Sequence, residues 1–235
     1  MSSMTLQYSW PNISATLGNN AFSYMLGAVE YPVVMGDGIW QFSDIRDYLQ
    51  QVMAQNLHYL VDASGQKVFY LDFIVNPVLY CLSLTVKRVP TVLPAGWTNP
   101  GITLGAYPQL KIPAGFTTVS GFAAGLYPAV PADIYQVNSG IPQITGVTSL
   151  RVLSDMVGSS ELSLESGVLA TFSVPSGQEA GAPIQLEPSN PMWVGVQKGV
   201  TITEISVRIV DQLRRPVTIR DPAGFVMIIN IRSAN

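Results

Sequence analysis

The sequence predicts an all-β protein: a single jelly-roll β-sandwich of about eight to ten strands, with one α-helix near residues 43–55. Three observations support this fold class. Short segments rich in Val, Ile, Leu, Tyr and Thr alternate between apolar and polar residues. Glycines (20) and prolines (17) separate these segments along the whole chain, and only one long segment has helical spacing. This combination favours two packed antiparallel sheets.

The clearest strand is predicted at residues 78–86, where Leu82, Leu84 and Val86 share one face and Ser83 and Thr85 share the other. The last apolar run, residues 225–231, predicts a strand that is buried on both faces. The remaining predicted strands lie at residues 5–10, 31–35, 67–71, 109–112, 149–153, 168–174, 192–196 and 205–210.

One segment breaks the strand pattern. Ile45, Leu49 and Val52 recur at spacings of four and three residues, which places them on one face of a helix. Ser43 is a suitable N-cap for that helix. A second, shorter helical turn is expected at residues 116–122.

No linker, repeat or change of composition divides the chain, so we predict one domain over residues 1–235, with about residues 1–30 as a candidate extended arm. The first residues lack the basic and apolar segments of a signal peptide, and no apolar run approaches the roughly 20 residues of a membrane span.

Charged residues are scarce. The 12 Lys and Arg against 15 Asp and Glu give a formal net charge of −3, and charged residues make up 11 % of the chain, against roughly 25 % in an average domain. Hydrophobic residues, at 48 %, are near the usual share. A weakly charged surface suits a protein whose faces are covered by neighbours. The composition therefore indicates assembly.

Reactive side chains are few. The chain has one histidine, His58, outside any catalytic motif, and one cysteine, Cys81, inside an apolar strand. Asp37, Asp44 and Asp47 are the residues that could hold calcium, but they lack EF-hand spacing. The glycines of residues 115–121 lack a phosphate-loop pattern. We expect no enzyme, metal site or cofactor.

Basic residues do not form a nucleic-acid footprint. Arg214 and Arg215 are the basic doublet, with Arg220 nearby, and the overall balance is acidic. We interpret this segment as an arginine turn at a boundary between subunits, and not as a genome contact.

Several blocks of the chain form one recognisable pattern, at residues 38–51, 56–62, 68–71, 76–80, 119–128, 211–216 and 220–229. The strongest part runs from a turn and an aromatic residue through the Asp44-Ile45 and Tyr48-Leu49-Gln50 helix to a Tyr-Leu-Val-Asp segment and a strand. These blocks resemble capsid proteins of small eukaryotic DNA viruses, such as polinton-like viruses and their genome-integrated relatives.

The resemblance implies a single jelly-roll capsid subunit located in the virion. The chain is too short for a double jelly roll, so the resemblance favours a penton protein that closes five-fold vertices as a pentamer. Its partners would be copies of itself and a neighbouring major capsid protein. The alternative is the sole or major capsid protein of a small single jelly-roll shell. The candidate subunit-interface residues are Arg214, Arg215, Arg220, Trp10, Trp97 and Tyr127.

Two other classes stay open. Turn-rich, aromatic sandwiches include carbohydrate-binding modules, in which a surface tryptophan such as Trp97 stacks on a sugar ring. The other class is an enzyme that uses His58 as a catalytic residue.

Overall fold

The computed structural model describes residues 3–76, 81–137, 140–144, 146–155, 167–174, 181–186, 204–220 and 225–229. The chain divides into two compact units. The terminal unit comprises Met1–Pro11 and Val147–Asn235, and the central unit comprises Asn12–Gly146. The central unit is therefore an insertion, in sequence, between the first strand of the terminal unit and its remaining strands. The single domain over residues 1–235 stays a prediction.

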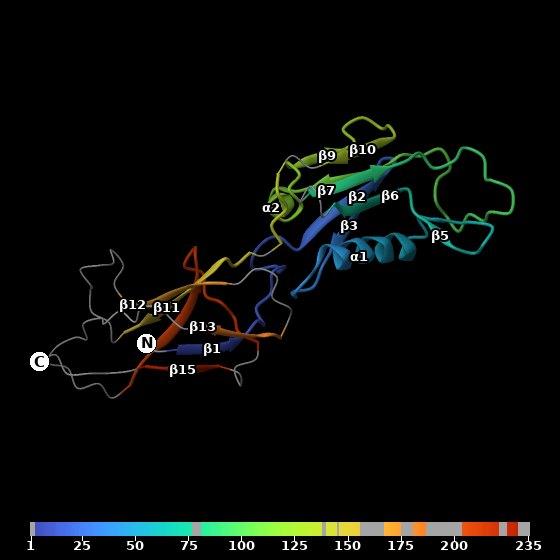
Figure 1. Ribbon diagram of the computed structural model, residues 1–235. Helices are drawn as coiled ribbons and strands as arrows, with labels where there is room; N and C mark the ends of the chain where they lie inside the picture. The colour runs from blue at the N-terminus through green and yellow to red at the C-terminus, as the bar shows by residue number, and fades with distance from the viewer. Residues whose placement is uncertain are drawn as a thin grey trace, which may run out of the picture. The chain divides into compact units, whose positions relative to one another are not determined.

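Two three-stranded sheets make up the described part of the terminal unit. The first has the order β13-β1-β15 and the second has the order β12-β11-β14. Their strands are β1 (Ser3–Gln7), β11 (Ser149–Ser154), β12 (Val168–Ser173), β13 (Pro183–Leu186), β14 (Val207–Asp211) and β15 (Val226–Ile228). Figure 1 shows β1 between its two partners, which come from the far end of the chain.

Apolar residues at every second position build the core of this unit. In β1, Met4 and Leu6 are buried, whereas their neighbours are partly exposed. In β11, Leu150 and Val152 are buried in the same alternation. This is the period of two that a strand needs when one of its faces is covered.

The central unit contains a four-stranded and a three-stranded sheet, in the orders β3-β2-β8-β9 and β10-β7-β6. Their strands are β2 (Ala21–Leu26), β3 (Val29–Val34), β6 (Leu71–Asn76), β7 (Cys81–Val86), β8 (Pro108–Ile112), β9 (Gly125–Tyr127) and β10 (Ile134–Val137). The short strands β4 (Leu60–Val61) and β5 (Lys67–Val68) form a separate pair. The helices are α1 (Phe42–Gln55), α2 (Thr117–Ser120) and the 3₁₀ turn η1 (Ala114–Phe116).

Aromatic side chains join these two sheets. The ring of Phe22 on β2 lies 6.3 Å from the ring of Phe73 on β6 and 4.9 Å from the ring of Phe116 in η1. From β7, Leu82, Leu84 and Val86 are buried in the same core, on the one face that the sequence predicts for them.

Helix α1 confirms the predicted helix near residues 43–55, and it buries Ile45, Leu49 and Met53. The N-cap is Gln41, not the predicted Ser43. The Gln41 backbone N–H donates to Asp44 Oδ2 at 2.8 Å, so the carboxylate satisfies a donor at the helix start. Arg46 forms a two-point ion pair with Asp72, which fastens the helix to β6.

The all-β, jelly-roll-like class is confirmed, because the sheets of the described residues are antiparallel throughout and their α-helices are two. Those residues hold fifteen strands, more than the eight to ten predicted, because the sequence pattern did not predict β2, β4, β6, β9, β10 or β13. The predicted strand at residues 192–196 lies outside the described residues. No helix among them is long and apolar enough to cross a membrane.

Of the predicted strand at residues 225–231, the structure describes residues 225–229, and these are not buried on both faces as predicted. In β15, Val226 is 56 % exposed and Ile228 is 51 % exposed, with Met227 partly buried between them. The strand pairs with β1 and has no second partner among the described residues. A continuous apolar run predicts a strand, but it does not predict whether both faces are covered.

Candidate functional site

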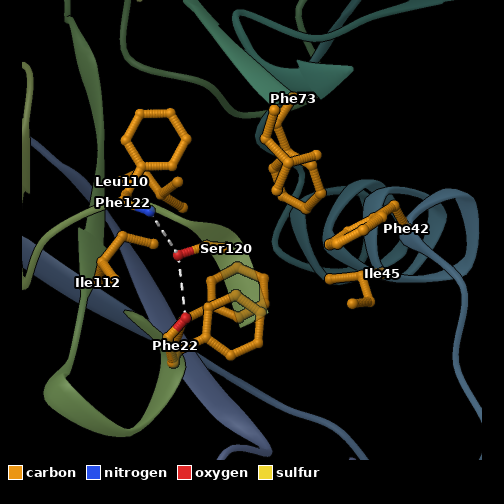
Figure 2. A pocket seen from close by; sticks show the side chains of 10 residues that line it. Phe22, Phe42, Ile45, Phe73, Leu110, Ile112, Ser120 and Phe122 are labelled. Atoms are coloured by element: carbon orange, nitrogen blue, oxygen red, sulfur yellow. Dashed lines mark hydrogen bonds between the residues drawn. The ribbon is translucent and has the colours of Figure 1, made fainter. Parts of the chain in front are cut away.

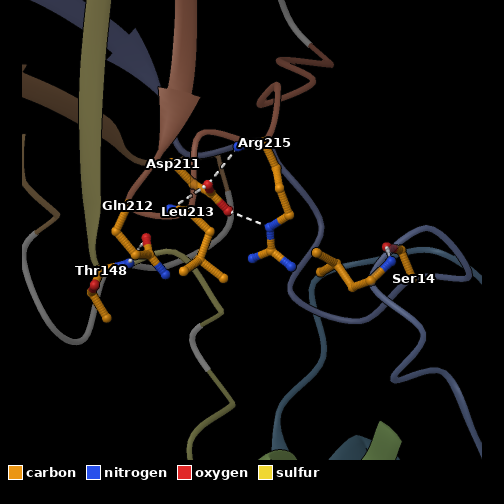
Figure 3. A network of polar contacts seen from close by, with 7 residues as sticks. Ser14, Thr148, Asp211, Gln212, Leu213 and Arg215 are labelled. Carbon is orange, nitrogen blue, oxygen red and sulfur yellow. Dashed lines mark hydrogen bonds and ion pairs between the residues drawn. The ribbon is translucent and has the colours of Figure 1, made fainter. Parts of the chain in front are cut away.

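One buried carboxylate holds the turn that follows β14, residues 211–215 (Figure 3). Asp211 is 2 % exposed. Its Oδ1 accepts the backbone N–H groups of Leu213 and Arg215, both at 2.8 Å, and its Oδ2 accepts Arg215 Nε at 2.7 Å. A buried carboxylate is costly unless such donors surround it. The three hydrogen bonds therefore stabilise Asp211 and fix the turn around it.

Backbone contacts close the same turn. The N–H of Asp211 donates to the carbonyl of Arg215 at 2.9 Å, and the N–H of Arg214 donates to the carbonyl of Asp211 at 3.0 Å. The Gln212 side-chain oxygen accepts the N–H of Thr148 at 3.2 Å, just before β11 begins. The turn is thus anchored at both ends to the β11-β14 pair.

The tip of the turn has unusual residues. Leu213 is 66 % exposed, although it is a large apolar side chain. Arg214 is exposed and has a φ of 63°, in the left-handed region that glycine and asparagine usually occupy. We call residues 211–215 the arginine turn. It presents an apolar side chain and a cationic residue on a rigid frame.

The three predicted interface arginines lie at two places in the terminal unit. Arg214 and Arg215 share the arginine turn, and the Nε of Arg215 is already paired with Asp211. Arg220 is exposed, and its backbone N–H donates to Ser9 Oγ at 3.0 Å. Their role in ion pairs between subunits stays a prediction.

The three predicted interface aromatics pack within the chain. Trp10 is 2 % exposed and has an edge-to-face contact with Tyr8, with ring centroids 4.7 Å apart. Trp97 is partly buried against a small apolar cluster that includes Leu60. Tyr127 packs on Phe122, and its hydroxyl donates to the Ala123 carbonyl at 3.0 Å. Sequence reasoning missed this packing because aromatic composition does not show which ring the core covers.

His58, the one histidine of the chain, is buried, at 6 % exposed. The Tyr24 hydroxyl lies 2.8 Å from His58 Nδ1 and also accepts a hydrogen bond from Asn56 Nδ2 at 3.2 Å. Which of the two groups donates in the Tyr24–His58 hydrogen bond depends on the tautomer of the imidazole.

Burial sets the protonation of both partners. It lowers the pKa of His58 and, as the largest cause, raises the pKa of Tyr24 to about 12. The ring of Tyr31 closes the cluster, stacked on Tyr24 and edge-to-face with His58. No carboxylate or nucleophile of the described residues has a hydrogen bond to this imidazole. We interpret the cluster as structural.

A narrow apolar pocket lies in the central unit (Figure 2). It has room for about one water-sized sphere. Among its lining residues, Ser120 is the polar one, and its hydroxyl donates to the Phe116 carbonyl while it accepts the Phe122 N–H. The lining side chains are Phe22, Phe42, Ile45, Phe73, Leu82, Leu110, Ile112, Phe116, Ser120 and Phe122. This arrangement offers no reactive group to a substrate.

The acidic and glycine-rich segments have local structural roles. Asp37 accepts the backbone N–H of Ala15, and Asp44 caps helix α1. Gly115 leaves no space for a Cβ, which would lie on the Gly18 carbonyl, and Gly121 ends α2 with a φ of 72°. In the described part of the chain, no three His, Cys, Asp or Glu side chains gather as a metal site would require.

Large apolar side chains are exposed in both units. In the terminal unit they lie on β15, in the arginine turn and at Ile205. In the central unit they include Ile74 and Tyr135 on one face of the β10-β7-β6 sheet, where the Tyr135 hydroxyl donates to Ser83 Oγ. The described chain therefore offers interaction surfaces more readily than a catalytic site.

Comparison with known proteins finds similar folds among solved structures. No protein-family model matches the sequence, and no curated protein matches it significantly. The fold is similar to the crystal structure of the mavirus penton protein, with a TM-score of 0.48 and 10 % identity over 95 % of this chain and 83 % of that one. It is also similar to a chain of the Sputnik virophage structure from cryo-electron microscopy, with a TM-score of 0.34 and 13 % identity over 95 % and 85 % of the two chains.

Proposed function

We propose that this protein is a structural component of a virus particle. It is a jelly-roll capsid subunit, formed by both units of residues 1–235, and it closes five-fold vertices as a pentamer. It has no catalytic role and acts through contacts with copies of itself and with a neighbouring major capsid protein. The observation that carries the proposal is the exposure of Val226, Ile228 and Leu213 in the terminal unit of a chain with 11 % charged residues.

The exposed strand β15 is the first part of that argument. If a neighbour covered the strand, the exposed apolar surface of Val226 and Ile228 would be removed from water. Burial of such surface drives association. Proteins that stay monomeric usually protect an edge strand with charge or proline. The described segment of β15 has neither, which suits a strand that a neighbour covers in the assembled particle.

Charge favours the vertex role over the sole-shell alternative. A shell that encloses its genome without other proteins needs positive charge to neutralise phosphates. This chain has a formal net charge of −3. A vertex protein has no such need, because the major capsid protein encloses most of the genome. The sequence resemblance to capsid proteins supports the same choice.

The carbohydrate-binding alternative depended on Trp97. Its ring is partly buried against the cluster with Leu60, so much of the ring is occupied within the chain. Sugar stacking needs an open aromatic face. The geometry therefore favours assembly over sugar recognition.

Mass photometry and negative-stain imaging of the purified full chain test the proposal. We expect rings of five subunits and, with the protein alone, no closed shells. Closed shells would support the sole-capsid alternative instead. A chain that stays monomeric up to the micromolar concentrations at which capsid proteins assemble would overturn the proposal, and specific glycan binding by that monomer would support the carbohydrate-binding class.

A further inference from the structure

Strand β1 occupies a slot that two later strands form. It lies between β13 and β15, in antiparallel register with both. The pairing continues past the strand, because the N–H of Tyr8 donates to the Ala182 carbonyl at 2.9 Å and the N–H of Gly181 donates to the Tyr8 carbonyl at 2.8 Å. We call β13 and β15, with residues 181–182, the β1 slot. A strand of matching register satisfies the backbone groups on both of its edges.

The segment in the slot is apolar at every second position. Met4 and Leu6 are fully buried, and Tyr8 and Trp10 follow at 5 % and 2 % exposed. Leu6 lies opposite Ile184 of β13, which is 1 % exposed. An empty slot would leave these side chains facing water, which is unfavourable. The alternation and the register therefore make the slot a binding site for a strand with the sequence of β1.

No local turn ties β1 to the slot. In the central unit, the two residues Gly27 and Ala28 join β2 to β3, so each strand stays beside its own partner. β1 instead reaches β13 and β15 only through the whole central unit, residues 12–146, and the strands that follow it. A short turn gives a strand a high effective concentration beside its partner, and β1 lacks that advantage. The β1 strand of a neighbouring copy can thus compete for the slot inside an assembly.

The connection that would open is one residue long. Trp10 is buried with the terminal unit, whereas the N–H of Asn12 donates to the Gly38 carbonyl at 3.0 Å inside the central unit. Pro11 lies between them and has no backbone N–H. A change of path at Pro11 therefore breaks no hydrogen bond donated by that residue. Short hinges favour the exchange of a flanking element between copies.

We propose that β1 is exchanged between copies of this chain. Each copy places residues 3–10 in the β1 slot of the next copy and receives the same segment from the copy before it. The inference rests on the proposed function and names the contact that joins the subunits of the ring. Exchange keeps the hydrogen bonds and the buried side chains of β1, so it costs little. The donating and receiving surfaces differ, so the interface is heterologous and can close into a ring.

A disulfide across the slot reports which copy supplies β1. Thr5, which is partly exposed, lies opposite the exposed Gln185. Opposite residues of antiparallel strands have Cα atoms about 4.5–5.5 Å apart, within the span of a disulfide. We expect Thr5→Cys with Gln185→Cys, in a Cys81→Ser chain, to form covalent species larger than the monomer on a denaturing gel without reductant. They should extend to five subunits, and reductant should return them to the monomer.

A control pair distinguishes exchange from crowding of cysteines in an assembly. Arg151 of β11 lies opposite Thr171 of β12, the next strand along the chain in the same unit. Arg151→Cys with Thr171→Cys, in the same Cys81→Ser chain, should cross-link within single chains and migrate as a monomer. Monomeric migration of the Thr5 and Gln185 pair, in chains that still form rings, would overturn the inference and leave the vertex proposal standing. Covalent species that stop at the dimer would support exchange and overturn the ring of five.

Complementary variants give a second readout that needs no cysteine. Leu6→Asp disables the strand and leaves the slot of the same chain intact, whereas Ile184→Asp disables the slot and leaves the strand intact. When the two variants are refolded together, an intact strand can meet an intact slot only between different chains. We expect heterodimers in native mass spectrometry of the mixture and no dimers of either variant alone. A mixture without heterodimers would contradict exchange.

Discussion

The central and terminal units differ in how their cores are assembled from the sequence. The central unit is one continuous segment, and its β2-β3 and β6-β7 pairs join strands that are neighbours along the chain. The terminal unit depends on β1, whose Met4 is paired with Leu186 and Met227. Contacts between residues so far apart in sequence require a large loop to close before they form. The difference indicates that the central unit can keep its fold when the terminal unit loses its own.

Reciprocal core variants test this difference and have the largest expected effect. Leu6→Asp places an unpaired carboxylate at a fully buried position and should lower the free energy of unfolding of the terminal unit by more than about 4 kcal/mol. Phe22→Ala removes a ring that packs on Phe73 and Phe116 and should lower that of the central unit by about 3–5 kcal/mol.

Hydrogen–deuterium exchange, followed peptide by peptide, measures the two units separately. Leu6→Asp should abolish protection of β11 and β14 and leave that of β2 and β7, whereas Phe22→Ala should do the reverse. Loss of protection in both units with either variant would show that they unfold as one cooperative body, and the comparison above would be wrong.

A smaller effect on stability is expected from a change at Asp211, the buried carboxylate of the terminal unit. In Asp211→Asn the side-chain amide cannot accept both from the backbone and from Arg215 Nε as the carboxylate does. We expect a loss of about 1–3 kcal/mol in the free energy of unfolding of the terminal unit. The amides of Leu213 and Arg215 should lose most protection from exchange. Arg151→Gln, a matched removal of charge from β11, is the control and should leave those two amides protected. If the amides of Leu213 and Arg215 were as protected in Asp211→Asn as in the natural chain, Asp211 would not be the residue that holds the turn.

Local patterns in the sequence predict single helices and strands of this fold. They do not predict which strands pair with one another. The spacing of Ile45, Leu49 and Val52 predicts α1, and the alternation of Leu82, Leu84 and Val86 predicts one face of β7, because both patterns follow from the geometry of a single element. The pairing of β1 with strands near the other end of the chain leaves no local pattern, so no division into two units could be predicted.

The turn at residues 211–215 was predicted in part for the same reason. The Arg214-Arg215 doublet lies in a turn as predicted, and its place at a subunit boundary stays a prediction. An aspartate at the start of a turn is a known signal for side-chain to backbone hydrogen bonds. The exposure of Leu213 and the burial of Trp10 depend on tertiary packing, which composition does not encode.

The smallest effect is expected from pH, and it should appear in the central unit, whose core contains the buried His58. Burial lowers the pKa of His58 in the folded chain, so the unfolded chain binds its proton more readily. Stability from the neutral imidazole is thus fully present above about pH 6.5, the unfolded pKa, and is lost as the pH falls through the lower folded pKa. Each pKa unit of that difference corresponds to about 1.4 kcal/mol.

Denaturant unfolding between pH 7.5 and 5, with exchange measured in β2 and α1, should show this loss in the natural chain. Both nitrogens of the protonated imidazole are donors, so the Tyr24 hydroxyl, which also accepts from Asn56, can then only accept from Nδ1. His58→Gln, which has no titrating group at this position, should be less stable at pH 7.5. Its free energy of unfolding should change less between pH 7.5 and 5 than that of the natural chain. The terminal unit should not share the slope, since the chain has one histidine and it lies in the central unit. An equal slope in His58→Gln would assign the pH dependence to carboxylates and remove His58 from the comparison.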